Sequence, residues 1–219
     1  MLVWRGVMDF QGKKANFLGD SITEGVGTSQ ASKIYLNRVQ AALGLASARN
    51  YGIGGTRIAP QHSGQPERGP SFLERYAEMA PDADLVVVFG GTNDYGHGDA
   101  PVGRFADRTP STFYGACHML MQGLIRRYPE ATIVFLTPLH RLSEDQPSPG
   151  NGLPLSAYVA IIKEVAGYYA LPVLDLYTVS GIQPNVPVIQ TQYCPDGLHP
   201  NDAGHARIAS RLMGFLQTL

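Results

Sequence analysis

The tripeptide Gly19-Asp20-Ser21 is the first place in the chain where residue types and spacing could support catalysis. It follows an apolar run at residues 15–18, which predicts a buried strand, and it precedes a turn into a helix. A serine at such a turn lies beside free backbone N–H groups, where the anion formed on an attacked carbonyl could be stabilised. The pattern indicates nucleophilic acyl transfer. The alternative is that Asp20 or Ser21 only caps the next helix.

The segment Asp196-Gly197-Leu198-His199-Pro200 is the second such place. In a tight turn, the Asp196 carboxylate can accept a hydrogen bond from the His199 ring, which leaves the other ring nitrogen free to take a proton. Pro200 favours an extended backbone at His199 and allows the last helix to begin just after it. The alternative is a turn before a helix that carries a surface histidine.

Gly55 and Asn93 could supply hydrogen-bond donors to an oxyanion. A glycine lets its backbone N–H approach a ligand without obstruction, and Asn93 follows the apolar run at residues 85–89. Together with the Ser21 N–H they make three donors, each worth roughly 3 kcal/mol of transition-state stabilisation. Alternatively, the glycines at 52–55 form a flexible turn and Asn93 is a turn former.

The elements that must position these residues alternate between strand and helix. Apolar segments predict strands at 15–18, 85–89, 133–136 and 173–174, and a short extended stretch is expected to reach Asn50. Amphipathic patterns predict helices at 31–43 (ended by Gly44), 71–79 (capped by Ser71), 113–128, 154–169 (with Pro154 as first residue) and from Asn201 or Asp202 onward. Residues 60–70, 95–110, 137–153 and 176–200 read as loops. This order predicts an α/β fold with a parallel sheet covered by helices on both sides, whose ligands lie beyond the carboxyl ends of the strands.

Length and composition favour one domain over residues 1–219 and exclude several classes of function. A formal net charge of −1 gives no electrostatic reason to expect nucleic acid or anionic lipid as partner, and no apolar run could cross a bilayer. The first nine residues do not resemble a secretory signal, so the numbered chain is expected in the cytoplasm, or secreted if a signal was trimmed from it. Cys117 and Cys194 fit no metal-ligand spacing.

Four short motifs together resemble the SGNH hydrolases, the GDSL-type esterase and lipase superfamily. Their order and approximate spacing match this family across residues 13–210, with Ile22 where the GDSL motif has leucine. The motifs are Gly19-Asp20-Ser21, Asn50-Tyr51-Gly52-Ile53-Gly54-Gly55, Gly91-Thr92-Asn93-Asp94 and Asp196-Gly197-Leu198-His199-Pro200-Asn201.

The resemblance implies a role for each matching residue. Ser21 would be the nucleophile, His199 the base and Asp196 its orienting partner. The Ser21 N–H, the Gly55 N–H and the Asn93 side chain would be the oxyanion donors, with Gly54 as an alternative to Gly55. The implied fold is a three-layer αβα sandwich, flavodoxin-like, with a five-stranded parallel sheet.

The expected activity is that of a cofactor-free serine esterase. Polar loop residues suggest a small acyl group on a hydroxylated leaving group, such as a carbohydrate O-acetyl ester; they are Arg57, Asp94, Tyr95, His140 and Arg141. A lysophospholipase or thioesterase with the same catalytic residues is one alternative, and a non-catalytic carbohydrate-binding module is another. Asp20 and Asp94 are expected to support loops by accepting backbone N–H bonds. No ligand spacing favours a metal site.

Overall fold

The computed structural model describes residues 9–63 and 69–219. Residues 1–8, which belong to the N-terminal segment considered above for a secretory signal, lie outside the described residues. Residues 64–68 of the predicted 60–70 loop also lie outside them.

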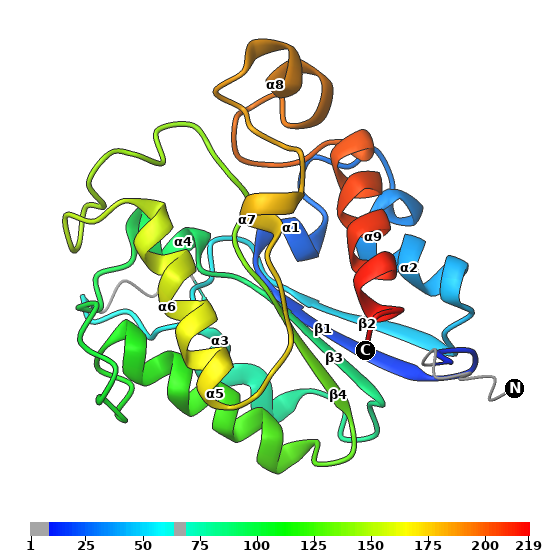
Figure 1. The fold of residues 1–219 in the computed structure, drawn as a ribbon, viewed down its shortest axis with the longest axis horizontal. Coiled ribbons are helices and arrows are strands. Elements are labelled where there is room, and N and C mark those ends of the chain that lie inside the picture. The colour runs from blue at the N-terminus through cyan, green and yellow to red at the C-terminus, as the bar shows by residue number, and fades with distance from the viewer. Residues whose placement is uncertain (1–8, 64–68) are drawn as a thin grey trace, which may run out of the picture.

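A parallel sheet forms the middle layer of the molecule (Figure 1). Among the described residues its strands are β1 (Lys14–Gly19), β2 (Ser47–Gly52), β3 (Leu85–Phe89), β4 (Thr132–Leu136) and β5 (Val173–Leu174). Their spatial order is β2-β1-β3-β4-β5 and every neighbouring pair is parallel. This is the flavodoxin-like order, in which the chain reverses direction across the sheet between β1 and β3. The predicted fold class is confirmed.

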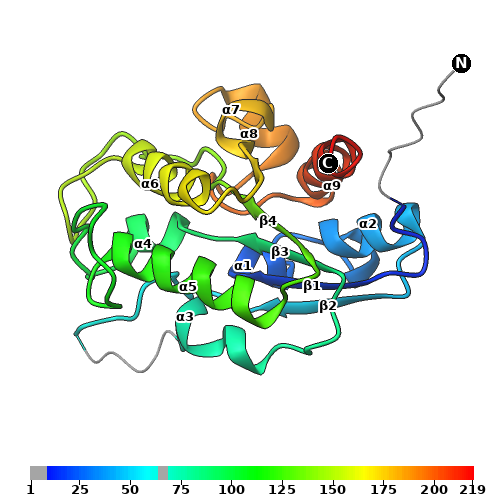
Figure 2. The ribbon, with the colours of Figure 1, turned by 60° about the horizontal axis from the view of Figure 1, so that its bottom comes forward.

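Helices cover both faces of this sheet (Figure 2). The α-helices of the described residues are α1 (Ser21–Glu24), α2 (Tyr35–Leu43), α3 (Phe72–Arg75), α4 (Thr92–His97), α5 (Phe113–Arg127), α6 (Leu155–Tyr168), α7 (Leu176–Val179), α8 (Pro187–Tyr193), which projects away from the sheet (Figure 1), and α9 (Asp202–Leu216). Successive strand residues point to opposite faces, so Val87 packs with α2 and α9 whereas Val86 and Val88 pack with α3, α5 and α6. None of the described helices is long and apolar enough to span a membrane.

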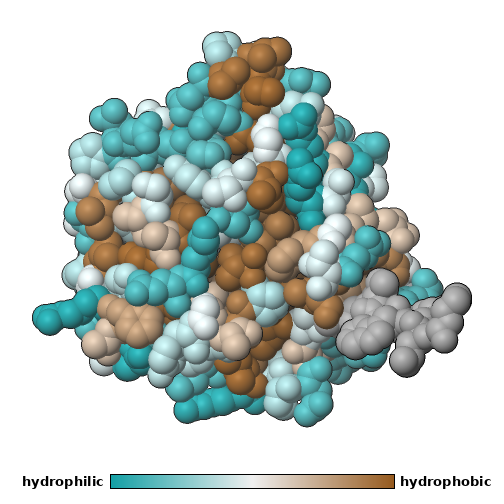
Figure 3. Space-filling model, in the orientation of Figure 1, coloured by the Kyte–Doolittle hydropathy of each residue, from teal (hydrophilic) through white to brown (hydrophobic). Residues whose placement is uncertain are grey.

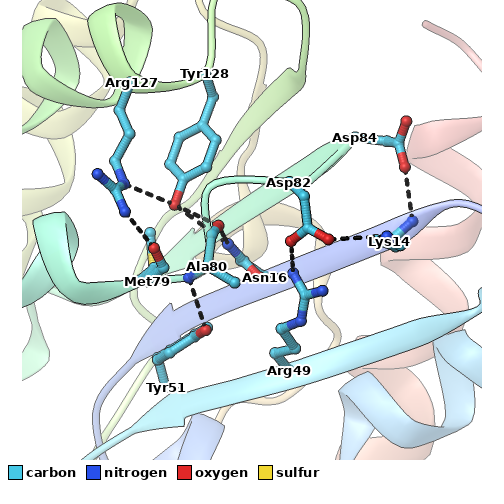
Figure 4. Close-up of polar contacts among 10 residues, drawn as sticks. All are labelled: Lys14, Asn16, Arg49, Tyr51, Met79, Ala80, Asp82, Asp84, Arg127 and Tyr128. Atoms are coloured by element: carbon cyan, nitrogen blue, oxygen red, sulfur yellow. Dashed lines mark hydrogen bonds and ion pairs between the residues drawn. The ribbon is translucent and has the colours of Figure 1, made fainter.

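Polar side chains bind the loop before β3 to the two strands beside it (Figure 4). Asn16 lies fully buried within β1, and its Nδ2 donates to the Ala80 carbonyl at 2.8 Å. The Tyr51 hydroxyl accepts the Ala80 N–H at 2.9 Å, and Asp82 forms an ion pair with Lys14 at 2.8 Å. These contacts explain how a polar residue is accommodated inside the apolar run of β1.

Several predicted boundaries are confirmed and others need correction. Gly44 ends α2 with a left-handed φ of 64°, Ser71 caps α3, and Asn201 caps α9. Pro154 is the cap of α6 rather than its first residue, because its ψ of 163° is extended.

The larger errors concern short helices. The predicted helix at 31–43 is divided at Ile34, whose backbone is extended, and the one at 71–79 is a single α-turn followed by a 3-10 turn. The predicted loop at 95–110 overlaps the end of α4, and the stretch at 176–200 contains α7 and α8. Helices of one or two turns show too few residues for a 3.6-residue period to be recognised.

Candidate active site

Ser21 is the first residue of α1 and lies directly after β1. A Cβ at Gly19 would lie 1.9 Å from the Thr23 hydroxyl oxygen, so this tight turn requires glycine. The Asp20 carboxylate accepts the Ile22 N–H at 3.0 Å and caps α1, while the Ser21 side chain is left free of that role. Asp20 therefore provides the cap, and the Ser21 hydroxyl is available for chemistry.

His199 is held by the turn that the sequence pattern predicts. Asp196 Oδ1 accepts the backbone N–H groups of Leu198 at 2.9 Å and His199 at 2.6 Å, and Oδ2 lies 2.7 Å from His199 Nδ1. Partial burial raises the pKa of the Asp196 carboxyl, but these hydrogen bonds outweigh it and hold the pKa below its ordinary value. An ionised Asp196 accepts a hydrogen bond from the Nδ1–H of the ring, and this tautomer leaves Nε2 as the basic nitrogen.

The two predicted segments meet although 178 positions separate them in the chain. Ser21 Oγ lies 3.0 Å from His199 Nε2. With the 2.7 Å contact from Nδ1 to Asp196, this gives a continuous line from carboxylate to imidazole to hydroxyl. Such a line lets the imidazole take the hydroxyl proton as the oxygen attacks a carbonyl.

The loop after α1 contacts the start of α9, so the two segments that carry Ser21 and His199 are joined beyond the catalytic residues themselves. A Cβ at Gly27 would lie 2.4 Å from the Pro200 carbonyl oxygen, so the two backbones are in close contact. The Asp202 carboxylate accepts the Ser29 N–H at 2.9 Å and the Ser29 hydroxyl at 2.6 Å. Buried His205 accepts the Tyr35 N–H at Nδ1 (3.2 Å), and the packing of α2 on α9 continues from there.

The candidate oxyanion donors other than the Ser21 N–H lie in the segments that follow β2 and β3, the two strands beside β1. Ile53 donates its N–H to the Gly19 carbonyl at 3.2 Å, so the loop after β2 starts beside the end of β1. A Cβ at Gly54 would lie 3.8 Å from Ser21 Cβ, and Gly55 has a φ of 75° that favours glycine. Asn93 on α4 donates from Nδ2 to the Thr56 carbonyl at 3.0 Å. Gly54 therefore lies beside Ser21, and Asn93 is joined to the loop that carries both glycines. The donor roles of Asn93 and of either glycine stay predictions.

Two further carboxylates lie buried behind the site and support loops, in the manner expected of them. Asp94 accepts the N–H groups of Ile58 and Ala59, each at 2.9 Å. Burial raises the pKa of Asp94 to about 6 against these hydrogen bonds. Burial, with a smaller contribution from the charge of Asp94, likewise raises the pKa of Asp20 to about 7. Neither carboxylate has a hydrogen bond to Ser21 or His199 among the described contacts.

Arg57 and Tyr95, two of the predicted substrate-binding residues, are buried. Arg57 is 2% exposed and donates to the Gly55 carbonyl at 3.2 Å. The Tyr95 hydroxyl donates to the carbonyls of Ser143 (2.5 Å) and Gln146 (3.1 Å). Their contacts shape the loops beside the nucleophile, and any direct contact with substrate stays a prediction.

His140 and Arg141 follow β4 and are more open. His140 Nδ1 lies 2.7 Å from the buried Glu144 carboxylate, and its ring lies 3.9 Å from that of Tyr177. Arg141 donates to the Thr92 carbonyl and hydroxyl, each at 3.2 Å. The neighbouring Leu142 donates its N–H to the Gly197 carbonyl at 2.8 Å, so this loop borders the Asp196 turn.

Arg75 contacts the segments that carry the candidate site, although no sequence pattern marks it. It is 6% exposed, and its guanidinium donates to the carbonyls of Tyr51 and Gly19 and to the Thr56 hydroxyl. In sequence it is only one charged residue of a predicted amphipathic helix. Its partners become visible only once the strand ends are placed in space.

Comparison with known proteins gives one family. Residues 17–207 match the model of the GDSL-like lipase/acylhydrolase family. A crystal structure of a Lactobacillus plantarum protein is similar at 35% sequence identity and a TM-score of 0.83, covering 95% of this chain and 98% of that one. No curated protein sequence matches the chain.

Two more distant structures share the fold. The lipase/acylhydrolase from Enterococcus faecalis is 23% identical with a TM-score of 0.64, and 94% of this chain and 96% of that chain align. A two-domain esterase active on acetylated mannans is 21% identical with a TM-score of 0.62, over 94% of this chain and 49% of that one.

Proposed function

Because this chain belongs to the GDSL-like lipase/acylhydrolase family and is a carboxylic ester hydrolase, we propose that Ser21, His199 and Asp196 hydrolyse the ester through an acyl-enzyme. The observation that carries the proposal is the 3.0 Å distance from Ser21 Oγ to His199 Nε2, with Asp196 2.7 Å from Nδ1 of the same ring.

In the acylation half, Ser21 Oγ attacks the ester carbonyl carbon while His199 Nε2 takes the hydroxyl proton. The electron pair of the carbonyl moves onto its oxygen, which the Ser21 N–H, the Gly55 N–H and Asn93 Nδ2 stabilise. When the tetrahedral intermediate collapses, His199 returns the proton to the leaving alkoxide, so that an alcohol departs and Ser21 remains acylated.

In the deacylation half, a water molecule takes the place of the alcohol. His199 Nε2 removes one proton from the water as its oxygen attacks the acyl carbon, and then protonates Ser21 Oγ as the acid product leaves. Asp196 stays ionised throughout, because its role is to orient the ring and to stabilise the imidazolium.

The proposed substrates are small acyl esters, above all O-acetyl groups on carbohydrates or similar hydroxylated compounds. His140 and Arg141 are the proposed contacts to the leaving group, since their loop borders the Asp196 turn at the carboxyl edge of the sheet. The fold shared with an esterase active on acetylated mannans supports this substrate class. Nothing in the reaction requires a metal or an organic cofactor.

Apolar side chains near the nucleophile favour a second candidate, an acyl hydrolase of the lysophospholipase or thioesterase type. Val26 and Ile53 are each 41% exposed, and their backbone N–H groups bond to Ser21 and Gly19 respectively. Val188 on α8 is 67% exposed, and an apolar patch covers the projecting tip of the molecule at α8 (Figure 3). These surfaces could contact a long acyl chain.

Two measurements test the proposal. Ser21→Ala should reduce turnover by about 10⁴-fold or more with an unchanged unfolding midpoint, and full turnover in that variant would contradict the mechanism. Steady-state kcat/KM on p-nitrophenyl esters from acetate to palmitate should be highest for acetate. A maximum at the long chains would favour the second candidate instead.

A further inference from the structure

Arg75 is the last residue of α3, and its position is fixed by local contacts. The helix begins with a capping box, in which the side chains of Ser71 and Glu74 each accept the backbone N–H of the other residue. The Phe72 ring lies 4.9 Å from the centre of the Arg75 guanidinium. The capping box fixes the start of the helix, and the Phe72 ring supports one side of the guanidinium.

The guanidinium joins three segments of the candidate site. Nη2 of Arg75 donates to the Gly19 carbonyl at 2.6 Å and to the Thr56 hydroxyl at 2.9 Å, and Nη1 donates to the Tyr51 carbonyl. Gly19 ends β1 two residues before Ser21, and Tyr51 lies near the end of β2. A planar, forked cation is suited to acceptors on several sides, which a lysine ammonium does not match.

Through Thr56 the contacts extend to the candidate oxyanion donors. The Thr56 hydroxyl donates to the Ile53 carbonyl at 2.7 Å, which closes the loop that carries Gly55. The Thr56 carbonyl accepts Asn93 Nδ2 at 3.0 Å. Both candidate donors outside α1 are thus connected to Arg75 by one or two hydrogen bonds.

Burial lowers the pKa of Arg75 to about 10, and the charge of Asp20 acts in the opposite direction. The guanidinium is consequently charged at neutral pH, and its hydrogen bonds to the carbonyls are charge-assisted and short. Such bonds define position more strictly than bonds between neutral groups.

We propose that Arg75 is a positioning residue that sets the distance between the Ser21 hydroxyl and the oxyanion donors Gly55 and Asn93. The inference rests on the proposed acyl-enzyme mechanism. Donors stabilise the transition state only where they meet the oxygen of the tetrahedral species, so a small displacement affects turnover much more than substrate binding.

Arg75→Lys tests the positioning role, because lysine retains the positive charge and lacks the planar, forked guanidinium. We expect kcat to fall at least about 10-fold while KM changes less than about 3-fold, because ground-state binding does not use the displaced donors. The inhibition constant of a boronic acid that forms a tetrahedral adduct on Ser21 should rise in parallel with the loss in kcat/KM. In Arg75→Ala, added guanidinium at millimolar concentration should restore part of kcat, and ammonium should not.

Arg127→Lys is the matched control (Figure 4). Arg127 also donates from its guanidinium to a main-chain carbonyl, that of Met79 (2.5 Å), and its guanidinium lies 5.5 Å from the ring of Tyr128. Unlike the contacts of Arg75, the contact with Met79 is made to the loop before β3 and not to the segments that carry the candidate site. Arg127→Lys should lower the free energy of unfolding about as much as Arg75→Lys does, while its kcat should stay that of the parent.

Two results would overturn the inference: a kcat in Arg75→Lys within about 2-fold of the parent, or equal losses of kcat in the two lysine variants. Either would reduce Arg75 to a structural residue. Failure of the proposed mechanism is recognised separately, by a Ser21→Ala variant that keeps its turnover.

Discussion

Three aspartates lie close to the candidate nucleophile, and their surroundings give them different roles. The side chain of Asp196 is 55% exposed and accepts two backbone N–H groups, so its pKa is lowered once the cost of partial burial is outweighed. Asp20 and Asp94 are buried, and burial raises their pKa values to about 7 and about 6. Only Asp196 is therefore both ionised across the neutral range and in contact with the histidine ring.

Asp196→Asn should leave the turn in place and disable the histidine. The amide oxygen can still accept the backbone N–H of His199, but the amide N–H₂ would face Nδ1 and favour the tautomer with its proton on Nε2. That proton would point at Ser21, which then has no base. We expect kcat to fall by about 10³–10⁴-fold with KM little changed, measured by steady-state kinetics on an acetyl ester.

Asp107→Asn is the control for this substitution. Asp107 is also an aspartate on a turn, and it accepts the backbone N–H of Arg104 at 3.1 Å; none of its contacts among the described residues involves the candidate site. The kcat of Asp107→Asn should equal that of the parent. A normal kcat in Asp196→Asn would mean that the ring is oriented by other groups.

At the scale of elements, the start of α9 has to hold His199 against the loop after α1. Asn201 caps α9 by accepting the N–H groups of Ala203 (3.0 Å) and Gly204 (3.1 Å). Its Nδ2 also donates to the Gln192 carbonyl at 3.0 Å, which joins α9 to the end of α8. The segment His199-Pro200 thus lies between two anchored elements.

Asn201→Ala should affect both stability and turnover. Loss of the cap should lower the free energy of unfolding by about 1–2 kcal/mol. The freed start of α9 should also lower kcat several-fold, because His199 is only two residues away. Urea unfolding and steady-state kinetics measure the two effects separately.

Thr112→Ala provides a matched loss of a helix cap. Thr112 caps α5 by accepting the Gly115 N–H at 3.1 Å, and none of its described contacts involves Ser21, Asp196 or His199. Thr112→Ala should lower the free energy of unfolding about as much as Asn201→Ala does, with kcat unchanged from the parent. Equal values of kcat in the two cap variants would show that α9 does not position His199.

The elements and the paired motifs could be predicted from local sequence, whereas the connections between them could not. Five buried apolar residues, four of them β-branched or aromatic, mark β3, and the spacing of Asp196 and His199 is itself typical of a local turn. Arg75 differs, since its partners at Gly19, Tyr51 and Thr56 are brought together only by the pairing of β1 with β2. Short helices such as α4 and α8 are likewise set by the packing around them rather than by a sequence period.

At the scale of the whole molecule, the carboxyl edge of the sheet carries both the candidate site and a set of buried charges. β1 lies between β2 and β3 at the point where the strand order reverses, which opens a crevice there in folds of this kind. Asp20, Arg75 and Asp94 lie buried beneath that edge. A site that depends on buried ionisable groups should make the stability of the molecule depend on pH.

The sign of this dependence follows from the raised pKa of Asp20, which burial moves from 3.8 to about 7. Above pH 3.8 the carboxyl of Asp20 has released its proton in the unfolded chain, whereas in the folded protein it keeps the proton up to a pH of about 7. The folded state then binds more protons than the unfolded state, so the contribution of Asp20 to stability is complete at acid pH and is lost as the pH rises through about 7. Asp94 acts with the same sign, and His205, whose pKa burial lowers to about 4, acts with the opposite sign.

Asp20→Asn isolates the contribution of Asp20 to the pH dependence of stability. Asp94 and His205 are present in both variant and parent, so their contributions largely cancel when the two free energies of unfolding are subtracted. The amide oxygen can still accept the Ile22 N–H, so the cap of α1 survives. Relative to the parent, the variant should gain stability on the order of 2 kcal/mol as the pH rises from about 5 to about 8. Urea unfolding of both proteins across this range measures the difference. Parallel curves would show that Asp20 ionises as readily in the folded protein as in the unfolded chain, and a difference of the opposite sign would mean that its charge is stabilised by Arg75 beyond the cost of burial.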